Sequence, residues 1–141
     1  MTKRYFIDTC IWRDFFEDRF SKTNRPIGGY ANKLFQKIIK ERQIVFYSPL
    51  IIKELNLRYN LSEIEIMLNI LYKIGLLQKI VPTNNEIIEA EKLSIQRNIP
   101  FVDCLNAIQA RNNDLIMVTQ DKHYFEKLFD FTRSKRPEDL I

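Results

Sequence analysis

Four acidic residues occupy positions in the sequence that could support metal-dependent chemistry. Asp8, Glu54 and Asp121 each follow a segment that we predict to be a β-strand, and Asp103 lies in the first turn of a predicted helix. Carboxylates gathered in one place repel one another, by about 1 kcal/mol at 4 Å in water and about 4 kcal/mol at an effective dielectric constant of 20. Such a cluster needs protons or a cation. Because its ligand atoms would all be oxygen, Mg²⁺ or Mn²⁺ suits it better than zinc.

Each acid also has an ordinary explanation. An Asp at the start of a helix is commonly a cap, and Glu54 alone could be a solvated helix residue. We interpret Asp14, Glu17 and Asp18 as surface residues. The coincidence of positions at strand ends therefore indicates the site, and no single residue does. A carboxylate-bound Mg²⁺ usually meets phosphate oxygens, so the chemistry expected of the cluster is water activation and phosphoryl transfer.

The elements that would position these acids alternate along the chain. We predict strands at 3–7, 44–47, 77–81 and 115–119, with a further short strand near Phe131, and helices at 9–20, 30–42, from Ser48-Pro49 onward, 62–76, 85–97, 100–111 and 121–129. The alternation predicts an α/β fold with a central parallel sheet flanked by helices. The length of 141 residues predicts one domain over 1–141. Ligands of such sheets bind at the carboxyl ends of the strands.

Local patterns predict some of the boundaries. Residues 21–29, which include the pair Gly28-Gly29, are typical of a loop. Ser62 and Glu65 form a capping-box pattern at the start of the helix that we predict from 62.

The predicted helix 62–76 has a second apolar stripe beside its core-facing one. The stripe consists of Ile66, Ile70, Ile74 and Leu77. A helix with two apolar sides is either buried between other elements or paired with a partner. If the stripe is exposed, it would form a homodimer or partner surface.

Composition narrows the class of protein. The single histidine, His123, argues against a zinc site built from several histidines and against a histidine-based triad. We interpret Cys10 and Cys104 as structural thiols, since two cysteines without a CxxC pair form no disulfide framework. No apolar stretch is long enough for a membrane span, and Asp8 interrupts the apolar start of the chain, so we expect a cytoplasmic protein without a signal peptide.

The segments around the four acids resemble the PIN-domain family. They are Phe6-Ile7-Asp8-Thr9, Ser48-Pro49 leading to Glu54-Leu55, Pro100 followed by Asp103, and Val118-Thr119-Gln120-Asp121-Lys122-His123-Tyr124. The resemblance implies a three-layer metal-dependent ribonuclease. It makes Asp8, Glu54, Asp103 and Asp121 the catalytic, metal-binding acids, with Thr119 as the hydroxyl residue of the catalytic set.

The length of the chain is similar to that of the stand-alone PIN proteins, the VapC-type toxins of toxin–antitoxin pairs. That resemblance implies an RNA substrate, a small antitoxin partner and a homodimer. The alternative within the family is an RNA-processing module, or one that binds RNA or protein, without an antitoxin. A net charge of 22 − 18 = +4 is compatible with an RNA partner but also common among other proteins.

Two other classes of protein also place acids at strand ends. A response-regulator phosphoacceptor should have paired acids after the first strand and a Lys after the last strand, whereas Asp8 is alone and Gln120 follows Thr119. A haloacid-dehalogenase-type phosphatase should have a second Asp at position 10, which is a cysteine. These two departures from the expected patterns favour the nuclease interpretation.

Overall fold

A five-stranded, fully parallel sheet forms the centre of the molecule, with the strand order β3-β2-β1-β4-β5. The structure is a computed structural model and describes residues 2–141. Its strands are β1 (Arg4–Ile7), β2 (Ile44–Tyr47), β3 (Leu77–Lys79), β4 (Ile116–Val118) and β5 (Arg133–Lys135). The predicted α/β fold with a parallel central sheet is confirmed.

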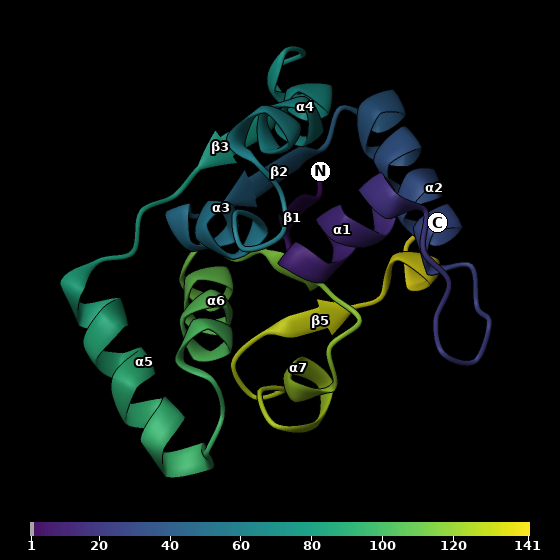
Figure 1. The fold of residues 1–141 in the computed structure, drawn as a ribbon. Helices are drawn as coiled ribbons and strands as arrows, with labels where there is room; N and C mark the ends of the chain where they lie inside the picture. Colours follow the sequence, from purple (N-terminus) through teal and green to yellow (C-terminus); the bar gives the residue numbers. More distant parts are fainter. Residues whose placement is uncertain (1) are drawn as a thin grey trace.

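Helices cover both faces of the sheet and complete the three layers (Figure 1). They are α1 (Thr9–Glu17), α2 (Ile27–Glu41), α3 (Pro49–Leu55), α4 (Leu61–Tyr72), α5 (Asn84–Arg97), α6 (Phe101–Asn112) and α7 (Lys122–Glu126), followed by the 3-10 turn η1 (Pro137–Asp139). Figure 1 shows α1, α2 and α4 on one side of the sheet and α5, α6 and α7 on the other. Right-handed crossovers require this division, because the chain runs outward from β1 to β3 and then returns to β4 on the other side of β1.

The reversal of strand order lies between β1 and β4. These strands pair with Ile7 opposite Val118, and the backbone N–H of Asp8 extends the pairing with a 3.0 Å bond to the Val118 carbonyl. Crossovers leave this point on opposite faces, so the carboxyl edge opens into a crevice where ligands of such sheets bind. The crevice places Asp8 beside the residues that follow β4.

The centre of the core is strand β1, whose residues Tyr5, Phe6 and Ile7 are fully buried. A central parallel strand is covered on both faces, which explains its uninterrupted apolar sequence. On one face, Trp12 and Phe35 join α1 to α2 with ring centroids 5.1 Å apart. This packing holds the start of α1, and with it Asp8, against the sheet.

The predicted loop 21–29 was wrong at its end, because Gly28 and Gly29 belong to helix α2. Gly28 lies against the backbone of Asp18, where an added Cβ would be 2.5 Å from the Asp18 Cα. Its N–H donates a 2.8 Å bond to the carbonyl of Arg19. The glycine is therefore needed for close packing between the end of α1 and the start of α2, and it marks no break. Helix α1 also ends at Glu17, earlier than predicted.

The start of α4 was also predicted wrongly. The N-cap is Asn60, whose side chain accepts a 2.9 Å bond from the N–H of Glu63, while the Glu63 carboxylate accepts a 3.1 Å bond from the N–H of Asn60. This capping box replaces the one that we predicted from Ser62 and Glu65. The sequence contained both patterns two residues apart, and the earlier one forms the cap.

Asp14 is fully buried, contrary to the prediction of a surface residue. Its Oδ1 accepts two hydrogen bonds from the guanidinium of Arg19, at 2.9 Å from Nε and 2.6 Å from Nη2. A buried carboxylate needs such a partner. Arg19, which is partly exposed, therefore has a structural role as the partner of this buried carboxylate.

The second apolar stripe of α4 is not one continuous ridge. The Ile66 side chain is 60% exposed, whereas Ile70 is half-buried and Leu77 is a buried residue of β3. Ile74 lies beyond the end of the helix and is 38% exposed. Only Ile66 and Ile74 thus present the stripe to solvent.

Within residues 2–141, no helix combines the length and the apolar character that a membrane crossing requires.

Candidate active site

The four predicted acids converge on one cleft of about 270 Å³ at the carboxyl edge of the sheet. Asp8 is the N-cap of α1 and Asp121 the N-cap of α7, while Glu54 lies in the last turn of α3 and Asp103 in the first turn of α6. Four separate elements therefore supply one carboxylate each. Thr119, the fifth predicted site residue, is fully buried directly behind the acids.

Asp8 is the most enclosed of the four acids, with 7% of its surface exposed. Its Oδ1 accepts a 2.8 Å bond from the N–H of Thr9, and its Oδ2 accepts a 2.8 Å bond from the hydroxyl of Thr119. Burial raises the pKa of Asp8 to about 7, and the charges of Asp103 and Glu54 act in the same direction, against the Thr119 hydrogen bond. Asp8 therefore needs either a proton or a nearby cation near neutral pH.

Glu54 reaches the site from the opposite wall. The hydroxyl of Thr9 donates a 3.0 Å hydrogen bond to its Oε1, which fixes one carboxylate oxygen. Burial raises the pKa of Glu54, and the negative charges of Asp103 and Asp121 raise it further, while the Thr9 hydrogen bond opposes the shift. The side chain of Thr9, the first residue after Asp8, thus couples two of the four acids.

Asp103, Asp121 and His123 form the tightest group of possible metal ligands. Their candidate ligand atoms all lie within 4.8 Å of one another. His123 Nδ1 is 2.8 Å from Asp103 Oδ2 and 3.6 Å from Asp121 Oδ1. Burial is the main cause that raises the pKa of Asp103, and the charge of Asp121 adds to it, whereas the His123 contact lowers it.

Thr119 connects the two sides of the strand reversal. Its hydroxyl donates to Asp8 and accepts a 2.9 Å bond from the backbone N–H of Asp121. The predicted hydroxyl residue is therefore in contact with one acid directly and with another through its backbone.

Sequence reasoning missed the contact between His123 and Asp103, since it used the single histidine only to argue against a histidine-rich zinc site and a histidine-based triad. It also missed the contact between Tyr124 and Asp103. The Tyr124 side chain is fully buried, and its hydroxyl lies 3.4 Å from Asp103 Oδ1. A usable signal was that Asp121 caps α7, which places the next three residues in the first turn of that helix, beside the cleft.

The cysteines agree with their interpretation as structural thiols. Both are free, and Cys104 is buried with its sulfur 4.0 Å from the carbonyl of Ile99. Cys10 lines the cleft and donates to Asp8 Oδ2 at 3.5 Å. Burial, followed by the charge of Asp8, raises the pKa of the Cys10 thiol well above its ordinary value. The thiol is therefore protonated and a poor nucleophile.

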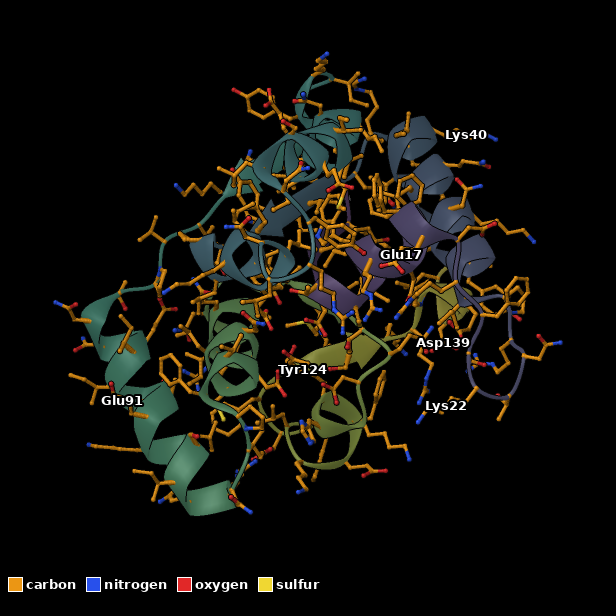
Figure 2. The ribbon with its side chains drawn as sticks, viewed as in Figure 1. Glu17, Lys22, Lys40, Glu91, Tyr124 and Asp139 are labelled. Atoms are coloured by element: carbon orange, nitrogen blue, oxygen red, sulfur yellow. The ribbon has the colours of Figure 1, made fainter. Side chains whose placement is uncertain are left out.

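The outer wall of the cleft is basic and apolar, and Leu57, Arg58 and Arg13 contribute to it. Arg13 is bound to Glu17 through a 2.9 Å ion pair. Two arginines that follow α1 are engaged in ion pairs, since Arg19 pairs with the buried Asp14 and the exposed Arg25 pairs with Glu138. Lys22, by contrast, projects from the loop between α1 and α2 (Figure 2).

The donor set fits a divalent cation. Among residues 2–141, no lysine or arginine forms an ion pair with any of the four acids, and His123 is the one basic side chain in contact with them. Carboxylate oxygens with one imidazole nitrogen suit a hard or borderline ion. Burial is the main cause that raises the pKa values of Asp8, Glu54 and Asp103, and the charges of neighbouring acids act in the same direction, so a bound cation would offset the cost of ionising them.

No protein-family model and no curated protein sequence matches the chain. Solved structures match it closely in fold. VapBC2 from Rickettsia felis, bound to a DNA fragment from its promoter, has a TM-score of 0.65 at 14% identity over 94% of this chain and 98% of the other. A toxin–antitoxin complex from Klebsiella pneumoniae has a TM-score of 0.64 at 14% identity over 94% and 97%. DNA-bound VapBC from Salmonella typhimurium has a TM-score of 0.59 at 16% identity over 97% and 99%. The chain thus has the PIN-like fold that the sequence motifs implied.

Proposed function

We propose that this chain is a metal-dependent endoribonuclease that hydrolyses RNA phosphodiester bonds. The observation that carries the proposal is the convergence of Asp8, Glu54, Asp103 and Asp121 on one cleft without a lysine or arginine partner. A cluster of this charge favours a divalent cation, and Mg²⁺ or Mn²⁺ suits the oxygen ligands. RNA supplies the phosphodiester that such a site can act on.

The residues would have distinct roles in this site. Asp8 and Asp103 are the primary metal ligands, and Glu54 and Asp121 complete the site directly or through water. When bound, the ion lowers the pKa of a water molecule and stabilises the negative charge that develops on the phosphate. Thr119 orients Asp8, and Thr9 orients Glu54, through the hydrogen bonds described above.

We further propose that the chain is the toxin of a type II toxin–antitoxin pair and acts in the cytoplasm as a homodimer. The support is the likeness in fold to structures of toxin–antitoxin complexes along nearly the full length of both chains. A small antitoxin protein would be its inhibitory partner. One domain would span residues 1–141, since a single sheet and its helices account for the described chain.

The direct test is cleavage of labelled single-stranded and hairpin RNA by the purified protein. Cleavage should require Mg²⁺ or Mn²⁺, stop on chelation and resume when the metal is restored. Asp103→Asn should remove the activity while the circular dichroism spectrum stays that of the parent. Glu91→Gln is a matched control, because Glu91 is an exposed residue of α5 (Figure 2) and does not line the cleft. Cleavage that persists in Asp103→Asn protein would overturn the proposal.

A further inference from the structure

The side chain of Asp103 is held at both of its oxygens by residues of α7. His123 Nδ1 contacts Oδ2 at 2.8 Å, and the Tyr124 hydroxyl contacts Oδ1 at 3.4 Å. Tyr124 is fully buried on the side of the sheet that carries α6 and α7 (Figure 2). A phenol that is buried against a carboxylate has a single proton to donate, so its orientation decides whether it supports or repels that carboxylate.

Asn106 determines this orientation. Its Nδ2 donates a 3.2 Å hydrogen bond to the Tyr124 oxygen, and its side chain is fully buried. Because the phenol oxygen accepts from Asn106, its own proton is directed to Asp103. Asp103 and Asn106 are three residues apart on α6 and lie on the same face of that helix. One hydroxyl from α7 therefore bridges two successive turns of α6.

Burial of the hydrogen-bonded pair Asn106 and Tyr124 has no evident packing advantage. The second amide atom, Asn106 Oδ1, is buried and forms no hydrogen bond within residues 2–141. An apolar pair of similar shape would fill the same volume without leaving a polar atom unpaired. The polar pair thus serves the carboxylate of Asp103, which the Tyr124 hydroxyl contacts.

We infer that Tyr124, oriented by Asn106, is a positioning residue that fixes Asp103 in the geometry that a bound divalent ion needs. The inference rests on the proposed metal site and extends it to two residues outside the cleft. Groups that hold metal ligands in place typically change metal affinity or activity by 10–100-fold when removed. The hydroxyl of Tyr124 holds Asp103 in this way, and the amide of Asn106 orients the hydroxyl of Tyr124.

The test is the dissociation constant of Mn²⁺, measured by calorimetry on chelator-treated protein. Tyr124→Phe should weaken Mn²⁺ binding by about 10–100-fold. Asn106→Leu should weaken it in the same direction, since the phenol proton is then no longer directed. Tyr5→Phe is the matched control, because Tyr5 is equally buried but lies in β1 three residues before Asp8 and outside the cleft. It should leave the affinity for Mn²⁺ unchanged.

The double variant Asn106→Leu/Tyr124→Phe separates positioning from stability. An apolar pair removes the unpaired amide, so we expect the double variant to regain much of the thermal stability that either single variant loses. Its affinity for Mn²⁺ should nevertheless stay weak. Unchanged Mn²⁺ affinity in Tyr124→Phe, or recovery of affinity together with stability in the double variant, would overturn the inference alone. Failure of the parent protein to bind Mn²⁺ would overturn the metal site and this inference with it.

Discussion

The Thr119 hydroxyl donates a 2.8 Å hydrogen bond to Asp8 Oδ2 between residues that are 111 positions apart in the chain. The bond crosses the point where the strand order reverses, and the same hydroxyl accepts from the backbone N–H of Asp121. One buried oxygen thereby sets the spacing between two acids from different segments.

Replacing this hydroxyl should impair the site without destroying it. In Thr119→Val, the side chain keeps its shape, but Asp8 loses a donor and the N–H of Asp121 loses an acceptor. We expect RNA cleavage to fall by about 10–100-fold, as for other groups that orient metal ligands. Thr119→Ser keeps the hydroxyl and should retain more activity than Thr119→Val in the same assay. Equal activity of the two variants would contradict the orienting role.

Removal of a primary ligand should have a larger effect. Asp8→Asn and Asp103→Asn keep the side-chain shape and remove a charge, so each should lower RNA cleavage by more than about 100-fold, beyond the usual effect of orienting groups. Neither change should unfold the protein, because the metal-free cluster is itself repulsive. Thermal melting in the presence of chelator should therefore show variants at least as stable as the parent. A variant that unfolds would indicate a structural role instead.

Divalent ions should stabilise the folded protein, because the site exists only when four segments come together. At a free ion concentration of 100 times Kd, the free energy of unfolding should rise by about 2.7 kcal/mol. For a domain of this size, such a gain raises Tm by roughly 5–10 °C. The measurement is thermal melting after chelator treatment, with and without added Mn²⁺ or Mg²⁺. Asp8→Asn should show a smaller shift than the parent, and equal shifts would locate the bound ion elsewhere.

The free energy of unfolding of the metal-free protein should decrease with rising pH, because the pKa of Asp8 is raised in the folded state. Its pKa is about 7 in the folded protein and near 3.8 in the unfolded chain, so between these values only the folded state holds the proton. The free energy of unfolding should then decrease as pH rises from about 4 to 7, by at most about 1.4 kcal/mol per pH unit for this group, and level off above that range. Glu54 and Asp103 act with the same sign, since burial raises the pKa of both.

Denaturant unfolding at several pH values in the presence of chelator tests this dependence. Asp8→Asn removes the titrating group and should make the decrease shallower. Bound Mn²⁺ should reverse the trend, because the ion competes with protons for the same oxygens. A metal-free parent that becomes more stable between pH 5 and 7 would contradict the assignment.

The exposed part of the α4 stripe should affect association more than folding. Ile66 is 60% exposed, so Ile66→Asp should leave the circular dichroism spectrum and Tm close to those of the parent. If this surface forms the proposed homodimer, the variant should sediment as a monomer where the parent sediments as a dimer. Ile70 is half-buried against the core, so Ile70→Asp should lower Tm and serves as the contrasting control. A folded Ile66→Asp dimer would place the interface elsewhere.

The sequence was sufficient to predict the parallel sheet and the convergence of the four acids on one cleft, because both depend on strong local signals. Apolar runs define the strands, and the acids follow them or open the next helix, so the parallel arrangement brings them together. The contacts of Tyr124 and Asn106 could not be predicted, since they depend on how α6 packs against α7, and the two residues are 18 positions apart in the sequence. The start of α2 was predicted wrongly because of Gly28, since a glycine needed for close packing cannot be told from a loop glycine by sequence alone.

The position of Asp121 at the start of α7 couples the cleft to the folding of a very short helix. Its Oδ1 accepts the N–H of His123 at 2.9 Å and so caps a helix of five residues. A helix this short has little stability of its own, so its order depends on the carboxylate and on its packing. An ion that holds Asp121 should therefore slow hydrogen exchange of the α7 amides, and local opening of α7 would release one wall of the site. The amides of α7 thus report on whether the cleft is assembled, even when no RNA is present.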